Sequence, residues 1–243
     1  MPLPPRPRAL LFDAGNTLLR MNYAAIVGEL ARHGVRVAPE DLQRAERRAR
    51  VRLDAEVLAQ GASTETVDTA FRYLAYALEG VGVTDAAIVD AVGAWRREYN
   101  RPVGLFNVPD PVAADALRLA RGAGLVTGVI SNSNGSVRDL MERLGLAAHL
   151  DFVLDSFEVG VEKPDPRIFR LALEHARVAP DEAVYVGDLY SVDVLGARRA
   201  GIAAILMDPD GCWGPRDCDA APDVLAGVRL VLARAATPPS PRA

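Results

Sequence analysis

Leu10-Leu11-Phe12-Asp13-Ala14-Gly15-Asn16-Thr17-Leu18 is the stretch of sequence from which the fold can be argued. Residues 9–12 form a brief apolar run, which is typical of a short buried strand. The run ends in Asp13, and a turn that contains Gly15 follows. A carboxylate at the end of a buried strand needs a partner or a metal ion, because its charge is otherwise costly to bury. Asp13 is therefore the first candidate for a functional residue.

Two further apolar runs of the chain also end in polar residues. These residues are Ser131-Asn132 after Val129-Ile130, and Gly187-Asp188 after Val184-Tyr185-Val186, with Asp193 five residues further on. Strand-like and helix-like segments alternate in this part of the chain, which predicts a parallel sheet with right-handed crossovers. Ligands of such sheets bind beyond the carboxyl ends of the strands. We therefore expect Asp13, Ser131 and Asp188 to converge on one crevice, although they are distant in sequence.

The chain contains a single lysine among its 28 lysine and arginine residues. This residue, Lys163, lies in the segment Glu162-Lys163-Pro164-Asp165-Pro166, between the second and third of the apolar runs. Lysine offers a compact ammonium on a flexible stem, whereas arginine offers a planar fork. A single lysine could survive by chance, but in a chain that otherwise uses arginine it also indicates a position where a point-like cation is needed.

Residues 20–104 differ in composition from the rest of the chain. Alanine, arginine, glutamate and leucine dominate, strand-like runs are absent, and helices are predicted near 22–34, 39–60, 63–80 and 84–100, with Ser63 and Thr84 as N-caps. We predict an α/β fold with a Rossmann-like, doubly wound parallel sheet as its core. The predicted parts are a core of residues 1–19 and 105–236, an inserted all-helical domain at 20–104, and a disordered tail at 237–243.

Composition excludes several classes of protein. The net charge is −4 and there is no basic block, so nucleic acid is not an expected partner. No apolar stretch approaches the roughly 20 residues of a membrane span. Met1 to Arg8 lack the apolar region of a signal peptide, so we expect a cytoplasmic location. Cys212 and Cys218 match no zinc pattern and are expected to be free thiols. The sequence does not indicate an oligomeric state.

Together these segments resemble the haloacid dehalogenase-like hydrolase superfamily over nearly the whole chain. The four signatures of that superfamily occur in its order, namely Phe12-Asp13-Ala14-Gly15-Asn16-Thr17-Leu18, Ser131-Asn132, Lys163-Pro164, and Gly187-Asp188 with Asp193. Each signature alone is weak, but four in order at predicted strand ends are specific. The resemblance implies a hydrolase whose helical cap is inserted after the first signature.

The resemblance also implies a role for each residue. Asp13 would be the nucleophile and would form an aspartyl-phosphate or an aspartyl ester. Ser131, with Asn132, would bind the transferred phosphoryl group, and Lys163 would stabilise Asp13 and the developing charge. The implied cofactor is Mg²⁺, with Asp13, the main chain of Gly15, Asp188 and Asp193 as its ligands or as residues that orient its waters.

Structural roles are the alternatives for several of these residues. Ser131 and Asn132 could cap the helix predicted near residue 135, and Asp188 could cap the helix predicted near 191. Asp193 could be a solvated acid on that second helix.

Gly15 departs from the pattern of the family phosphatases. Those enzymes carry a second aspartate at this position, which protonates the leaving group and then activates water. Such a group is worth roughly 10²–10⁴-fold in rate. We therefore expect a magnesium-dependent phosphohydrolase that is slow or that prefers good leaving groups, such as acyl or aryl phosphates.

Two other functions also fit the sequence. The chain could be a non-catalytic protein that binds phosphate or a metal ion, or a metal-free 2-haloacid dehalogenase. The acid at Asp188 argues against the dehalogenase, because a metal-free site should avoid a second carboxylate beside Asp13. The expected substrate is a small molecule, and the resemblance makes the start of the cap the source of its contacts, with Arg20, Asn22 and Tyr23 as candidates.

Overall fold

The computed structural model describes residues 1–101 and 103–236, and these residues form two compact units. Unit 1 consists of Met1–Leu19 and the described residues from Pro109 on, and unit 2 consists of Arg20–Val108. The tail predicted at 237–243 lies outside the described residues. None of the helices within the described ranges is long and apolar enough to cross a membrane.

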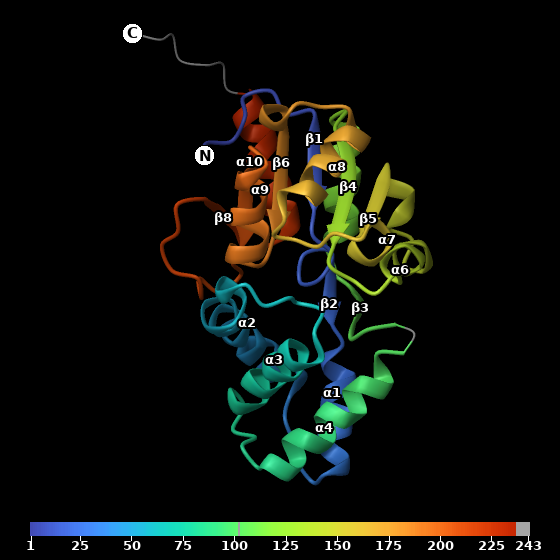
Figure 1. Cartoon of the computed structure of the whole chain (residues 1–243), viewed down its shortest axis with the longest axis vertical. Helices are drawn as coiled ribbons and strands as arrows, with labels where there is room; N and C mark the ends of the chain where they lie inside the picture. The colour runs from blue at the N-terminus through green and yellow to red at the C-terminus, as the bar shows by residue number, and fades with distance from the viewer. Residues whose placement is uncertain (102, 237–243) are drawn as a thin grey trace. The chain divides into compact units, whose positions relative to one another are not determined.

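Unit 1 is built on a six-stranded sheet of strands within the described residues (Figure 1). The strands follow one another across the sheet in the order β5 (Phe152–Asp155), β4 (Val126–Ser131), β1 (Ala9–Phe12), β6 (Ala183–Gly187), β7 (Ala203–Met207) and β8 (Asp219–Ala221). Every neighbouring pair in the sheet is parallel. The α/β prediction with a parallel sheet is therefore confirmed.

Helices connect the strands and pack against the sheet. The helices of unit 1 are α5 (Ala113–Gly122), α6 (Val137–Arg143), α7 (Ser156–Val159), α8 (Pro166–Ala176), α9 (Leu195–Arg199) and α10 (Val224–Ala236), with a π-helical turn at Tyr190–Val194 and short 3₁₀ turns at Ala147–His149 and Pro180–Glu182. Helix α5 packs against α10, and α8 packs against α9, while β4 contacts both α5 and α8. All four residues of β1 and all five of β6 are buried, as the apolar runs predict.

The order of the strands fixes where a ligand site can form. The chain passes from β1 to β4 and β5 on one side, and then from β6 to β7 and β8 on the other. The strand order thus reverses at β1 and β6, and ligands of doubly wound sheets bind at the carboxyl ends of the strands at such a switch point.

Unit 2 is mainly helical. It contains α1 (Tyr23–Arg32), α2 (Pro39–Glu56), α3 (Val67–Glu79) and α4 (Ala86–Tyr99), and a 3₁₀ turn at Leu58–Gln60. The predicted N-caps Ser63 and Thr84 are wrong, because the side chains of Thr66 and Asp85 accept the first backbone N–H groups of α3 and α4.

A short ribbon that the sequence did not predict lies where unit 2 leaves and rejoins unit 1 along the chain. Strand β2 (Leu19–Met21) pairs with β3 (Phe106–Pro109), and the backbone N–H of Asn22 donates to the carbonyl of Leu105.

A fully buried acid stabilises the helices of unit 2. Glu46 of α2 is 0% exposed and accepts from the guanidinium of Arg50 and from the phenols of Tyr23 and Tyr73. These partners come from α1, α2 and α3, so one carboxylate links three helices.

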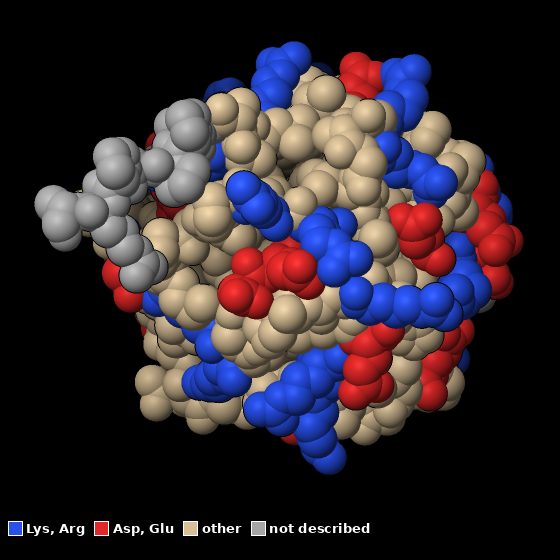
Figure 2. All heavy atoms as spheres, turned by 90° about the horizontal axis from the view of Figure 1, so that it is seen from above, with Lys and Arg blue, Asp and Glu red and all other residues tan. Residues whose placement is uncertain are grey.

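The surface carries charges of both signs. Acidic and basic side chains are intermixed on the face shown in Figure 2. Within the described residues, Cys212 and Cys218 are not joined in a disulfide, as expected.

Candidate functional site

The sheet brings three of the predicted residues to one edge. Asp13 follows β1, Ser131 is the last residue of β4, and Asp188 follows β6. Strand β1 lies between the other two, in a register that pairs Phe12 with both Val129 and Val186. The three strands therefore end within two residues of one another, and their polar residues lie at the carboxyl edge that topology selects.

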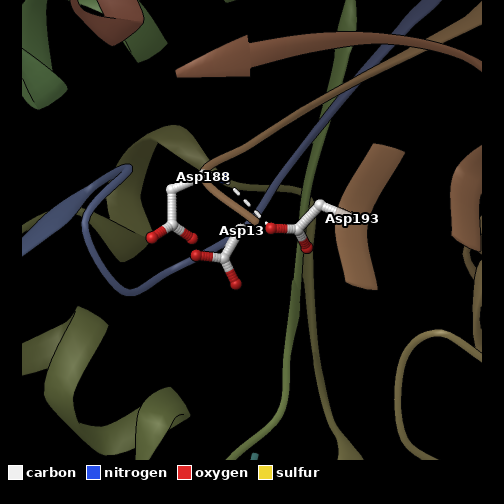
Figure 3. A group of neighbouring side chains, drawn as sticks. All are labelled: Asp13, Asp188 and Asp193. Carbon is white, nitrogen blue, oxygen red and sulfur yellow. Dashed lines mark hydrogen bonds between the residues drawn. The ribbon is translucent and has the colours of Figure 1, made fainter. Parts of the chain in front are cut away.

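Three carboxylates converge there. One carboxylate oxygen from each of Asp13, Asp188 and Asp193 lies within 4.8 Å of the other two, and all three residues are buried (Figure 3). Asp193 comes from the π-helical turn that follows Asp188 in the chain. Three close, buried oxygen donors suit a hard cation such as Mg²⁺, which coordinates oxygen and offsets the repulsion between the acids. The side chains that are present therefore fit a divalent cation.

Lys163 provides a compensating charge in this cluster. Its Nζ lies 2.6 Å from Oδ1 of Asp13, 2.8 Å from Oδ1 of Asp193 and 2.9 Å from the phenol oxygen of Tyr185. An ammonium has three N–H donors, and these three acceptors match them in number. The side chain is 3% exposed. Burial acts to lower the pKa of Lys163, but Asp13 and then Asp193 raise it above its ordinary value, so the lysine stays charged.

The same surroundings also raise the pKa of the Asp13 carboxyl group. Burial raises the pKa of Asp13 to about 6, although Lys163 lowers it, and the neighbouring charge of Asp193 raises it again. The group therefore ionises close to neutral pH.

Asp193 uses both of its oxygens within the protein. Oδ1 accepts from Lys163 and, at 3.1 Å, from the phenol of Tyr185. Oδ2 accepts from the backbone N–H groups of Asp188 and Leu189 at 3.0 and 2.9 Å, the first of which is dashed in Figure 3. The acid is buried, so the interpretation of Asp193 as a solvated residue is wrong. Its contacts hold Lys163 in place and shape the backbone beside Asp188.

The two residues of the second signature lie beside Lys163 in different ways. The side-chain amide of Asn132 exchanges two hydrogen bonds with the backbone of Lys163, at 2.9 and 2.8 Å. The hydroxyl of Ser131 is buried and lies 3.3 Å from the carbonyl oxygen of Asn132. Neither side chain caps α6, because the backbone N–H groups of Gly135 and Val137 donate to Asp155 instead.

Asp188 does not cap the helical turn that follows it either. That turn begins after Leu189 without a side-chain cap, and the nearby N–H groups donate to Asp193. The carboxylate of Asp188 instead accepts from the side-chain amide of Asn16, at 3.2 Å. Gly15 forms an isolated bridge with Leu19 in the same loop.

Sequence reasoning missed two residues of this site, Asn16 and Tyr185. Asn16 has a φ of 53°, in the left-handed region where asparagine is among the better tolerated side chains. Tyr185 is a fully buried phenol in an otherwise apolar strand. An asparagine directly after a glycine and a tyrosine inside an apolar run were the available signals.

The three candidates at the start of the cap belong to unit 2. Arg20 lies in β2. Asn22 caps α1 and donates to Tyr99 and Asn107, while the phenol of Tyr23 donates to Glu46.

Comparison with known proteins agrees with this geometry. A family model described as haloacid dehalogenase-like hydrolase matches residues 7–201. The human haloacid dehalogenase-like hydrolase domain-containing protein 3 is 33% identical over 207 residues, which cover 82% of this chain and 81% of that protein. The phosphoserine phosphatase of Thermus thermophilus is 43% identical over 118 residues, 48% of this chain and about half (47%) of its own length.

Solved structures share the fold. The HAD-hydrolase YfnB from Bacillus subtilis superposes with a TM-score of 0.64 at 16% identity, over 93% of this chain and 99% of that one. At this identity the likeness concerns the fold alone.

Proposed function

Because the chain belongs to the haloacid dehalogenase-like hydrolase family, we propose that it is a magnesium-dependent phosphohydrolase that reacts through an aspartyl-phosphate on Asp13. The buried cluster carries this proposal: Asp13, Asp188 and Asp193 bring three acids together, and Lys163 supplies one ammonium. The excess negative charge suits a divalent cation. The partial match to a phosphoserine phosphatase supports phosphate chemistry.

The residues that would hold the ion are Asp13, Asp188 and the main chain of Gly15, with Asp193 orienting them from behind. Asp193 is assigned this supporting role because its two oxygens already accept four hydrogen bonds. When bound, Mg²⁺ would neutralise part of the charge on the transferred phosphoryl group.

The proposed reaction has two steps. An oxygen of Asp13 attacks phosphorus, the P–O bond to the leaving group breaks, and the leaving group departs with the electron pair. Water then attacks phosphorus and releases inorganic phosphate and the free carboxylate. Lys163 holds Asp13 through Oδ1 and stabilises the charge that develops, while the hydroxyl of Ser131 donates to a phosphoryl oxygen. Asn132 keeps Lys163 in place by binding its backbone.

Gly15 has no side chain that could act as a general acid, and we use this to infer the preferred class of substrate. No carboxylic acid at that position can protonate the leaving group, so groups that leave as stable anions are favoured. Acyl phosphates and aryl phosphates meet this requirement. The same absence supports the alternative of a non-catalytic protein that binds phosphate or a metal ion. A metal-free 2-haloacid dehalogenase is disfavoured, because Asp188 would repel the nucleophile without a cation between them.

The proposed role of residues 20–104 is that of a substrate-selecting cap. Arg20, Asn22 and Tyr23 are its candidate substrate contacts, of which Asn22 and Tyr23 also have partners inside unit 2.

A direct assay tests the function. The protein is given p-nitrophenyl phosphate or acetyl phosphate, with Mg²⁺ or with EDTA, beside the Asp13→Asn variant. Release of phosphate that needs Mg²⁺ and disappears in the variant supports the proposal. Halide release from a 2-haloacid in EDTA would favour the dehalogenase, and Mg²⁺ binding without turnover would favour the binding protein.

A further inference from the structure

Asn16 connects two loops of unit 1 that are far apart in sequence. Its side-chain amide nitrogen lies 3.2 Å from Oδ2 of Asp188, a residue 172 positions away. Asn16 belongs to the loop after β1, which carries Asp13, and Asp188 belongs to the loop after β6. The amide therefore joins the two loops at the carboxyl edge of the sheet.

The backbone of Asn16 is kept in a conformation that side chains disfavour. Its φ of 53° is positive, and within the described residues Arg177, at 55°, is the other residue besides glycine for which this holds. Glycine would satisfy such a backbone without strain. Asparagine is less favourable than glycine in this backbone conformation, but its side chain makes the contact with Asp188 that glycine could not make.

The charges of the cluster explain why a neutral donor suits this position. Lys163 contacts Asp13 and Asp193, whereas Asp188 is held by the uncharged amide of Asn16. A lysine or arginine at residue 16 would neutralise part of the negative charge of the carboxylates, which stabilises a bound divalent cation. An aspartate there would add a fourth acid and would have no N–H to donate. An amide orients Asp188 and leaves the negative charge available.

We propose that Asn16 is a positioning residue that orients the carboxylate of Asp188 for a divalent cation bound between the loops after β1 and β6. This inference rests on the proposed function, since it assumes that the cluster binds Mg²⁺. Residues that orient metal ligands typically change metal affinity by roughly 10–100-fold when they are removed.

The test is a calorimetric titration of the 243-residue chain with MgCl₂ alone. Asn16→Gly removes the amide and keeps a residue that accepts the left-handed backbone. Arg177→Gly is the matched control, because it relieves the same backbone conformation at the end of α8. We expect Asn16→Gly to weaken Mg²⁺ binding by roughly 10–100-fold and Arg177→Gly to leave it unchanged.

Thermal unfolding in EDTA separates an effect on positioning from a loss of structure. Asn16→Gly should melt within roughly 4 °C of the wild type, because relief of the backbone strain offsets much of the loss of the hydrogen bond to Asp188. Asn16→Asp should melt roughly 2–4 °C lower, since it places a like charge against Asp188.

The possible results separate the inference from the function on which it rests. Equal Mg²⁺ affinity of the wild type and Asn16→Gly would overturn the role of Asn16 and leave the proposed function standing. No Mg²⁺ binding by the wild type would overturn both. An unchanged melting temperature of Asn16→Asp would contradict the contact with Asp188.

Discussion

The substitution Asp193→Asn tests the hydrogen-bond arrangement around the lysine most sharply. The carboxylate accepts on both sides: Oδ1 faces Lys163 and Tyr185, and Oδ2 faces the backbone N–H groups of Asp188 and Leu189. An asparagine side chain has one acceptor oxygen and one donor NH₂ group. In either orientation, its NH₂ group therefore meets donors that the carboxylate satisfied.

The expected cost follows from these contacts. If the amide nitrogen faces the backbone, two buried N–H groups lose their partner, and each unsatisfied group costs about 1–3 kcal/mol. If the amide nitrogen faces Lys163, the buried ammonium loses one of its two carboxylates, and breaking a buried ion pair costs about 3–5 kcal/mol. We expect Asp193→Asn to lower the free energy of unfolding of unit 1 by about 3–5 kcal/mol.

Urea denaturation in EDTA at pH 7.5 measures this loss without a metal ion. Trp213 is buried in unit 1 and provides the fluorescence signal, with Trp95 of unit 2 replaced by phenylalanine in all variants. Asp181→Asn, at an exposed acid, is the control and should change the stability by less than about 0.5 kcal/mol. A loss below about 1 kcal/mol for Asp193→Asn would refute the reasoning, because the four hydrogen bonds would then contribute too little to hold the lysine.

Four further predictions concern the same site. Gly15→Asp should raise the rate on alkyl phosphates by up to ~10²–10⁴-fold and change that on acyl phosphates little, and a uniform change across both would contradict the missing-acid argument. Lys163→Arg should lower kcat by at least ~10²-fold, because a planar fork cannot reproduce the three contacts of Nζ, and near-normal turnover would refute this. The pKa of Asp13 is about 6, and the protonated acid is a poorer ligand. The Mg²⁺ affinity measured by calorimetry should therefore fall as the pH drops from 7.5 to 5. A constant affinity would argue against Asp13 as a ligand. Gly187→Ala should cost about 1–3 kcal/mol in urea denaturation, because its Cβ would lie 2.5 Å from Cγ of Asp193, and wild-type stability would show that this contact relaxes freely.

The site residues that could be predicted from the sequence are those at the ends of strands. Asp13, Ser131 and Asp188 each follow or close a buried apolar run, and parallel strands end at one edge of the sheet, so their convergence could be expected. The lone lysine could be singled out by composition, and the structure puts it against Asp13.

The residues and strands that could not be predicted from the sequence are those whose partners are distant along the chain. The partner of Asn16 is 172 residues away, and Tyr185 contacts a lysine 22 residues before it, so no local pattern marks either residue. The same holds for the ribbon of β2 and β3, whose strands have three and four residues, too few to show an alternation of apolar and polar side chains. The start of α3 was misplaced because Ser63 and Thr66 are both good caps, and local preference does not choose between them.

Because Lys163 is the single lysine of the chain and is buried, its reactivity reports how often the surrounding structure opens. Reagents that acylate amines find one side-chain target in the whole sequence, and that target is 3% exposed and fixed by three hydrogen bonds. Acylation of the ε-amino group therefore requires a local or global opening of unit 1. The rate at which mass spectrometry detects a label at Lys163, set apart from labelling of the terminal amine, measures how often that region opens. Ligands that stabilise the closed carboxyl edge of the sheet should slow this labelling about tenfold for each ~1.4 kcal/mol of stability that they add.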